Sequence, residues 1–308
     1  MDLSILIPVY DEEESINELY QTVCENIPEN TSCEIVFAND GSKDGTLAKI
    51  TDLQKSDPRV VALNSKRNRG KSSALAAAFD FASGDLAITL DGDLQDDPRE
   101  FKNLIAKINE GYDLVSGWKI KRQDNGLRKF ASKVFNTLVA VITECNLHDI
   151  NCGLKIYKKE VYKNLLIYGD LHRLLPALAQ HDGFKIGEIP VNHFPRKFGH
   201  SKYSLFRVRG ILDLVSVRFI SSFSLRPFHF FGMTGGASLF LGILIWLYSA
   251  FNSFSLASLM HSLFFIGIGL FSFSLGFASE LIINHYLYFQ KKKDNAFKPQ
   301  TAEGSELN

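Results

Sequence analysis

Lysine and arginine are absent from residues 227–290, and Glu280 is the only acidic residue in this stretch. Residues 228–251 and 259–283 are dominated by Leu, Ile, Phe, Gly, Ala and Ser, and a helix of about 20 such residues crosses a bilayer. We therefore predict two transmembrane helices joined by a short loop at 252–258. A pair of helices in a soluble core is disfavoured by the length, glycine content and lack of charge of both runs.

The chain also lacks signals of other protein classes. Its 34 basic and 34 acidic residues balance, so no overall charge attracts nucleic acid. Its first residues, MDLSILIPVY, have no basic region and too short an apolar run for a signal peptide, and they predict a β-strand. Its four cysteines form no C-x-x-C pair and are expected to be packing residues, namely Cys24, Cys33, Cys145 and Cys152.

Basic residues flank both predicted spans. Arg218 and Arg226 precede the first, and three lysines at 291–293 follow the second. The positive-inside rule then places both ends, and with them residues 1–226, in the cytoplasm of an inner or plasma membrane. Glu280 is costly to expose to lipid, so we expect it to lie near the interface or to pair with another helix, which favours subunit packing in a homo-oligomer.

Short apolar runs alternate with helical patterns over residues 1–117. The expected strands are 3–9, 34–38, 60–64, 86–90 and 114–116, and helices are expected from about 13, 45, 71 and 99. This alternation predicts an α/β domain with a mostly parallel sheet covered on both faces. Ligands of such sheets bind beyond the carboxyl ends of the strands, where the polar clusters PVYDEEE, NDGSKDGT and DGDLQDD fall.

Acidic residues gather after the fourth expected strand. In DGDLQDDP, an extended chain would direct Asp91 and Asp93 to one side, and Gln95 would continue that face. Hard cations such as Mg²⁺ prefer carboxylate and phosphate oxygens, and a bound metal would stabilise a departing diphosphate. Asp96 and Asp97, just before a proline, are typical of a helix N-cap.

Basic residues follow the third expected strand in RNRGKSS. This segment contains G-K-S, but a phosphate-binding P-loop needs a glycine where Ser65 stands. The P-loop interpretation therefore fails. Arg67, Arg69 and Lys71 remain either phosphate ligands or a solvated basic helix start.

Six motifs in order resemble glycosyltransferase family 2, in particular the membrane-anchored polyprenyl-phosphate glycosyltransferases of the dolichol-phosphate mannose synthase type. They are IPVYDEEE, NDGSKDGT, RNRGKSSAL, DGDLQDDP, DINCGLKIY and RKFGHSKYS, and two spans follow them. The resemblance covers nearly the whole chain and implies a Rossmann-like GT-A catalytic domain. It divides the chain into a cytoplasmic GT-A domain (1–200), a juxtamembrane amphipathic segment (201–227), a transmembrane hairpin (228–290) and a polar cytoplasmic tail (291–308).

The resemblance also implies roles for individual positions. The positions that match the family's nucleotide-sugar site are Pro8, Tyr10, Glu12, Ala38, Asp40 and Asp91. Two more are expected there from the chemistry of their residue types, namely Lys71 and Gly92. The positions expected around a Mg²⁺ or Mn²⁺ ion are Asp91, Asp93 and Gln95. Those expected at the acceptor phosphate are Lys119, Arg128, Ser132 and Arg196, and the residues expected to carry catalysis are Asp91, Asp93, Arg128 and Arg196.

Three positions depart from the family's pattern. Asn39 stands where an aspartate is frequent and Asp11 where asparagine is usual, which affects the nucleotide side. Lys119 replaces an arginine, so it neutralises phosphate as a point charge without a bidentate fork. Two further interpretations stay open. Asp149 is expected either to position the acceptor or the sugar, or to anchor a loop. His172 and Arg173 are expected either to face the sugar or to begin a helix.

The expected reaction is transfer of one sugar, with inversion, from a nucleotide-sugar such as UDP-glucose, UDP-N-acetylglucosamine or GDP-mannose to polyprenyl phosphate. The acceptor oxygen is already ionised, so a strong general base is unnecessary and positive charge must hold the phosphates together. The segment 201–227 is expected to lie in the lipid headgroups, or else to pack on the sheet.

Three competing functions are weighed against this reaction. A processive polysaccharide synthase is disfavoured because neither Trp118 nor Trp246 follows a Q-x-x-R pattern. A metal-dependent phosphohydrolase would need its acidic pair on the first strand, where this chain has PVYDEEE. An inactive membrane-tethered module that binds a nucleotide-sugar is disfavoured because the expected site residues are all present, namely Asp91, Asp93, Gln95, Arg128 and Arg196.

Overall fold

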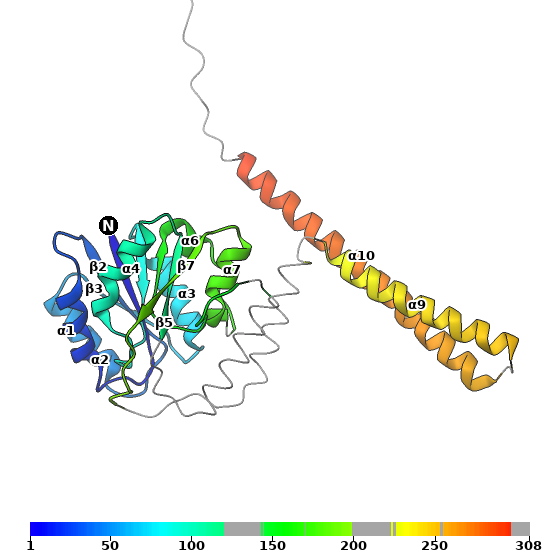
Figure 1. Ribbon diagram of the computed structural model, residues 1–308, viewed down its shortest axis with the longest axis horizontal. Helices are drawn as coiled ribbons and strands as arrows, with labels where there is room; N and C mark the ends of the chain where they lie inside the picture. The colour runs from blue at the N-terminus through cyan, green and yellow to red at the C-terminus, as the bar shows by residue number, and fades with distance from the viewer. Residues whose placement is uncertain are drawn as a thin grey trace, which may run out of the picture. The chain divides into compact units, whose positions relative to one another are not determined.

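The structure is a computed structural model that describes residues 1–119, 143, 145–169, 171–198, 223, 226–252 and 255–296, with side chains of the last helix as far as residue 286. The chain forms two compact units, Met1–Arg218 and Phe219–Asn308 (Figure 1). The strands are β1 (Leu3–Val9), β2 (Cys33–Asn39), β3 (Val60–Asn64), β4 (Leu86–Thr89), β5 (Leu114–Lys119), β6 (Lys155–Lys158) and β7 (Ile186–Val191). The helices of the first unit are α1 (Ile16–Asn26), α2 (Thr46–Ser56), α3 (Lys71–Phe81), η1 (Pro98–Glu100), α4 (Phe101–Ile108), α6 (Lys159–Asn164), η2 (Leu171–Arg173) and α7 (Leu175–His181).

The first unit contains a seven-stranded sheet in the order β3-β2-β1-β4-β6-β5-β7. All neighbouring pairs are parallel except those of β6, which runs antiparallel to both β4 and β5. The predicted mostly parallel sheet is therefore confirmed. The strand β6 lies inside the sheet, so β5 and β7 are attached to the first four strands through an antiparallel strand.

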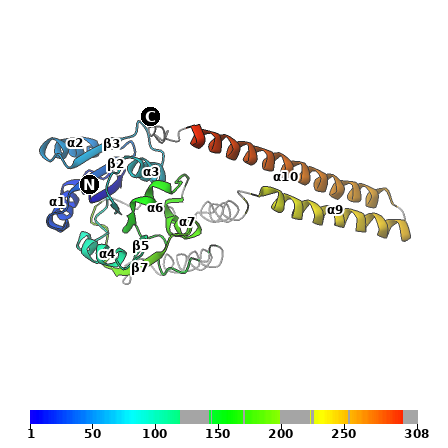
Figure 2. The same cartoon turned by 90° about the horizontal axis from the view of Figure 1, so that it is seen from above.

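Helices cover both faces of this sheet, as Figure 2 shows. Alternate side chains of β1, such as Ile5 and Ile7, pack in one apolar core with α1, α2 and α4, whereas Leu6 packs in the other with α3, α6 and α7. Burial on both faces explains why apolar residues dominate β1 and β2 without strict alternation. All four cysteines are free thiols that contribute to packing, and three of them are buried, as the sequence predicts.

The second unit is a hairpin of α9 (Pro227–Phe251) and α10 (Leu256–Ala296), each long and apolar enough to cross a membrane. Only 11% of the most apolar window of each helix is buried, which a core helix of a soluble protein would not show. The expected loop at 252–258 is too long, because α10 begins at Leu256. The helix also continues past residue 283 to Ala296, through the lysines at 291–293.

Small and polar residues join the two helices of the hairpin. A side chain at Gly235 would meet the carbonyl oxygen of Gly269 at 2.9 Å, so the backbones approach closely at this point. Ser262 and Ser238 donate hydrogen bonds to backbone carbonyls of the opposite helix, both at 2.8 Å.

Glu280 also connects the two helices. Its carboxylate accepts from the backbone N–H of Phe228 at 3.3 Å, which satisfies a free donor in the first turn of α9. The expectation that Glu280 pairs with another helix is therefore confirmed within the same chain.

Candidate active site

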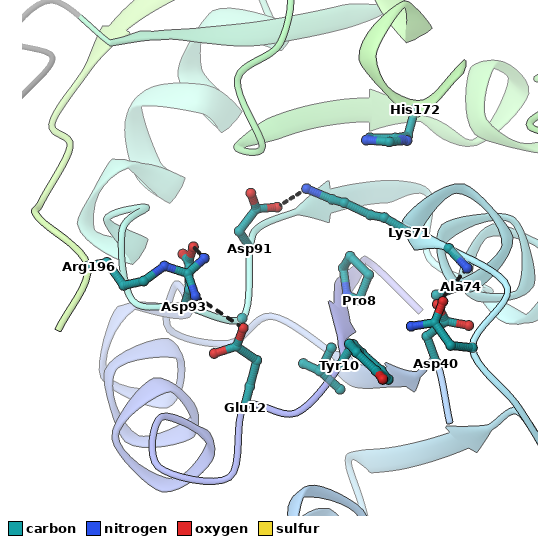
Figure 3. Close-up of a pocket in the computed structure, with 14 residues that line it drawn as sticks. Pro8, Tyr10, Glu12, Asp40, Lys71, Ala74, Asp91, Asp93, His172 and Arg196 are labelled. Atoms are coloured by element: carbon teal, nitrogen blue, oxygen red, sulfur yellow. Dashed lines mark hydrogen bonds and ion pairs between the residues drawn. The ribbon is translucent and has the colours of Figure 1, made fainter. Parts of the chain in front are cut away.

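A cavity of about 300 Å³ opens at the carboxyl ends of β1, β2 and β4 (Figure 3). The residues that line it are Pro8, Val9, Tyr10, Glu12, Asp40, Asn68, Gly70, Lys71, Ala74, Asp91, Gly92, Asp93, His172 and Arg196. Parallel strands bring the polar segments that follow them to one edge of the sheet. Segments from residue 8 to residue 196 meet there, so the cavity is a product of the whole fold of this unit.

Most of the residues expected at the donor lie in this cavity. Of the eight predicted for the nucleotide-sugar, Ala38 alone does not line it, because it is buried in β2 beside Pro8. Asp40 accepts hydrogen bonds from the backbone N–H groups of Arg69 at 2.8 Å and Gly70 at 2.7 Å. The carboxylate therefore holds the loop that leads into α3, and this loop in turn places Lys71 at the cavity.

Each of the two central carboxylates is paired with a basic side chain. Lys71 forms an ion pair with Asp91, and Arg196 forms one with Asp93 (Figure 3). Arg196 also contacts Glu12 at 3.4 Å, which ties residue 196 to the loop after β1. Acidic and basic groups are thus already arranged in pairs, and both kinds face the cavity.

The two carboxylates differ in their affinity for protons. Burial disfavours the charged form of Asp91, but the ammonium groups of Lys71 and Lys119 outweigh it and hold the pKa of Asp91 below its ordinary range. Burial and the neighbouring Asp91 raise the pKa of Asp93 to about 6, against the opposing charge of Arg196. Asp91 is therefore the permanently ionised member of the pair, and Asp93 is the first to gain a proton as the pH falls.

The segment after β4 does not follow the extended course expected from the sequence. Leu94 has a φ of 61°, so the chain turns between Asp93 and Gln95. The side-chain amide of Gln95 consequently donates to the carbonyl oxygen of Phe194 at 3.3 Å and does not line the cavity. The expectation of one face shared by Asp91, Asp93 and Gln95 is wrong on this point, because a left-handed residue breaks the alternation.

The last two acids of this segment have separate structural partners. Asp97 accepts from the backbone N–H of Arg99 at 3.1 Å and caps η1, as the sequence predicts. Asp96 is no cap. Its carboxylate accepts from the backbone N–H of Asp91 at 3.2 Å and forms an ion pair with Lys119 at 3.1 Å.

Lys119 lies behind the cavity. Its side chain is 10% exposed and faces Asp96, which is buried. Burial opposes its charge, yet the carboxylates of Asp96, Asp91 and Asp149 raise the pKa of Lys119. Lys119 is therefore paired with the acidic segment, and a direct contact with acceptor phosphate stays a prediction. Arg128 and Ser132 lie outside the described residues.

Gly153 fits against the same acidic segment. A Cβ atom at this position would lie 2.6 Å from Cγ of Asp91 and 2.7 Å from Oδ2 of Asp96. Its carbonyl oxygen accepts from the hydroxyl of Thr89 at 2.8 Å. Glycine is therefore required here by the close approach of two carboxylates, which explains part of the DINCGLKIY motif.

Asp91 and Asp93 provide suitable ligands for a divalent metal ion. Among the described residues, no cluster of three or more His, Cys, Asp and Glu side chains could hold such an ion alone. Two carboxylates with the remaining positions left to phosphate oxygens and water are typical of Mg²⁺ sites. The donor set thus fits an ion that binds together with a diphosphate.

The fold and this cavity define a glycosyltransferase of the GT-A type. The chain belongs to glycosyl transferase family 2, whose model matches residues 4–166. The resemblance inferred from the motifs is confirmed. Glucosyl-3-phosphoglycerate synthase from Mycobacterium tuberculosis, solved with Mn²⁺ and uridine-diphosphate-glucose, has a similar fold: the TM-score is 0.51 at 17% identity, over 71% of this chain and 78% of that chain.

Two curated relatives are similar along most of the chain. Dodecaprenyl-phosphate galacturonate synthase of Rhizobium johnstonii is 37% identical over 267 residues, which are 84% of this chain and 78% of that protein. Undecaprenyl-phosphate 4-deoxy-4-formamido-L-arabinose transferase of Salmonella typhimurium is 37% identical over 219 residues, 70% of this chain and 66% of that protein.

Proposed function

We propose that the protein transfers a single sugar from a nucleotide-sugar to polyprenyl phosphate, with inversion at the anomeric carbon. The observation that carries this proposal is the cavity in which Asp91 and Asp93 lie opposite Lys71 and Arg196. Such a site can hold a metal ion and two phosphate groups at once. The names of both relatives, each a transferase or synthase that acts with a prenyl phosphate, support the same acceptor.

Different residues of the cavity are assigned different roles in the proposed reaction. Tyr10 and Asp40 lie at the end of the cavity that we assign to the nucleoside, and Asp91 and Asp93 would hold Mg²⁺ or Mn²⁺. The bound ion would stabilise charge on the departing nucleoside diphosphate. Lys71 and Arg196 add positive charge for phosphate oxygens. The acceptor oxygen, already ionised, attacks the anomeric carbon directly, and the bond to the diphosphate breaks on the opposite side.

Turnover of a panel of nucleotide-sugars tests this proposal. Purified, detergent-solubilised protein is incubated with Mg²⁺ or Mn²⁺, with and without undecaprenyl phosphate, and release of nucleoside diphosphate is followed. The panel contains UDP-glucose, UDP-N-acetylglucosamine and GDP-mannose, and nucleotide derivatives of the two sugars in the relatives' names. We expect release that requires both metal and lipid phosphate, and we expect Asp93→Ala to abolish it.

Each remaining outcome of this assay favours a different function. Release without the lipid would indicate a hydrolase or another acceptor. No release with any donor would favour an inactive binding module. Full activity of the Asp93→Ala variant would refute the assignment of the metal to this carboxylate.

A further inference from the structure

His172 lies on the wall of the cavity and has no part in the steps described above. Its ring lies beyond the Lys71–Asp91 pair, on the opposite side from Tyr10 and Asp40 (Figure 3). A donor whose nucleoside contacts Tyr10 and whose diphosphate lies at Asp91 would therefore extend its sugar toward His172. The residue is carried by η2, the short helical turn that precedes α7.

Two hydrogen bonds hold this histidine in place. The hydroxyl of Ser72, in the first turn of α3, lies 2.8 Å from Nδ1 of His172 and accepts from the backbone N–H of the same residue at 3.1 Å. The ring is thus tied to the helix that also carries Lys71. Within the described part of the chain, no hydrogen bond involves Nε2, so this atom is available to a ligand in the cavity.

The chemistry of the site restricts what Nε2 can do. Burial, with Lys71 and Arg173 acting in the same direction, lowers the pKa of His172 to about 2. A neutral ring donates or accepts one hydrogen bond but does not take up a proton at physiological pH, so it is no general base. Nor does His172 complete a metal cluster with the carboxylates among the residues that the structure describes.

We propose that His172 binds the transferred sugar, with Nε2 hydrogen bonded to a sugar hydroxyl and Nδ1 held by Ser72. This inference rests on the proposed function, because it assumes a nucleotide-sugar donor in the cavity. The contact fixes the orientation of the sugar ring relative to the diphosphate. It also makes His172 a determinant of which sugar the enzyme accepts, since a hydroxyl in the wrong position leaves a polar atom unpaired.

Two substitutions separate the roles of the two ring nitrogens. His172→Asn keeps a polar group near Nδ1, within reach of Ser72, and removes the group at Nε2. His172→Gln extends an amide toward the position of Nε2. We expect His172→Asn to weaken binding of the nucleotide-sugar about tenfold, the loss of one hydrogen bond, and to leave binding of the corresponding nucleoside diphosphate unchanged within about twofold. His172→Gln should recover part of the loss.

The measurement is isothermal titration calorimetry of the full-length protein with Mn²⁺, using UDP or GDP and each nucleotide-sugar of the panel. His181→Asn is the matched control, because His181 lies half exposed at the end of α7 and outside the cavity. The pH profile of kcat/KM should keep its shape in His172→Asn. Loss of the acidic limb, the fall in kcat/KM at low pH, would instead make His172 a general base and overturn the proposal.

Equal losses of affinity for the nucleotide-sugar and for the nucleoside diphosphate in His172→Asn would also overturn the proposal. Unchanged affinity for both ligands would overturn it as well. Thermal unfolding of each variant shows whether a loss comes from misfolding, and Ser72→Ala provides a second route because it releases the ring without altering it. Failure of the proposed function is seen separately. Wild-type protein that binds nucleotide-sugars but shows no turnover with undecaprenyl phosphate would refute the acceptor while leaving the test of His172 intact.

Discussion

Ion pairs at the two central carboxylates have a consequence for metal binding. A metal ion on its own must compete with Lys71 for Asp91 and with Arg196 for Asp93. A diphosphate offers both basic side chains new partners and the metal new ligands. Metal and nucleotide should therefore bind cooperatively, and linkage requires each to strengthen the other equally.

This cooperativity is measurable with Mn²⁺ by electron paramagnetic resonance. We expect saturating UDP or GDP to tighten Mn²⁺ binding at least about tenfold, a coupling within the usual range. In Lys71→Gln the coupling should shrink, because the metal no longer displaces an ammonium group and the diphosphate loses one. The exposed Lys66→Gln is the control. Equal Mn²⁺ affinity with and without nucleotide would contradict the prediction.

Gly153 gives a second prediction for a single residue. In Gly153→Ala, the new methyl group must displace the Asp91 or Asp96 carboxylate, and both are anchored by lysines. We expect kcat/KM to fall about a hundredfold, equivalent to about 3 kcal/mol of transition-state stabilisation, because Asp91 leaves its position. Steady-state kinetics with the donor that the panel identifies would measure this loss.

Gly111→Ala is the control for that substitution. A Cβ atom at Gly111 meets nothing within 4 Å, but the residue has a φ of 95°. It should therefore lower stability by about 1 kcal/mol and leave kcat/KM unchanged. Equal kinetic losses in the two variants would mean that the effect of Gly153→Ala is general destabilisation.

Single residues also mark the limit of prediction from the sequence. The motifs identify Asp91, Asp93 and Arg196, which the structure brings to one cavity. They do not reveal that Gln95 turns away or that Lys119 is buried against Asp96. Both depend on the left-handed turn after Asp93 and on the packing of distant segments. The same holds for two residues of the RNRGKSS motif, at positions 68 and 70, because only the fold shows that they line the cavity.

At the scale of elements, the linkage of α1 to α2 depends on one aspartate. Asp57, at the end of α2, accepts from the hydroxyl of Tyr20 in α1 at 2.7 Å and from the guanidinium of Arg59 at 2.8 Å. The Arg59 side chain, helped by Tyr20 and opposed by burial, lowers the pKa of Asp57 to about 2. A carboxyl whose folded pKa is lowered stabilises the protein above its ordinary pKa, and this contribution is lost as the pH falls toward 2.

Asp57→Asn should therefore lower the free energy of unfolding by about 2 kcal/mol at pH 7, with a smaller difference near pH 3. Thermal unfolding of the detergent-solubilised protein followed by circular dichroism measures both values. Asp52→Asn removes an exposed pair with Lys55 and should have an effect below about 0.5 kcal/mol. A loss that is constant between pH 3 and pH 7 would contradict the electrostatic explanation.

Elements differ in how well the sequence predicts them. The strands β1 to β5 are apolar runs, and their alternation with helices is enough to predict a parallel sheet. In contrast, β6 has the sequence KIYK, with lysines at both ends, and β7 contains a proline and a glutamate. Lys155 is nevertheless buried in β6. The place of β6 in the sheet depends on its pairing with β4 and β5, which are distant in the sequence and therefore leave no local signal.

At the scale of the whole molecule, the hairpin constrains where the ends of the chain lie. Two spanning helices return the chain to the side on which it entered the membrane, so the catalytic unit and residue 296 should share one side. Because Arg226 and the lysines at 291–293 flank the hairpin, we expect that side to be the cytoplasm.

Reporter fusions test this topology. A cytoplasmically active reporter at the C-terminus should be active, and a tag placed between residues 252 and 255 should be accessible only from the opposite side of the membrane. Protease treatment of sealed inverted vesicles should degrade the catalytic unit. Protection of that unit in inverted vesicles would reverse the orientation, and opposite locations of the unit and the C-terminus would exclude the hairpin as two spans.

The position of β6 between β4 and β5 determines when the site is completed as the chain is made. Strands β1 to β4 are synthesised within the first 89 residues, but β4 gains its second neighbour only from residues 155–158. Until then β4 is an open edge, which is prone to pair with other chains. Gly153 and the carboxylates it contacts come together at the same late step, and contacts between such distant segments form slowly. A nascent chain that ends before residue 153 therefore holds the strands β1 to β4 with their acidic segment, but lacks both the second neighbour of β4 and the glycine that fits against Asp91 and Asp96.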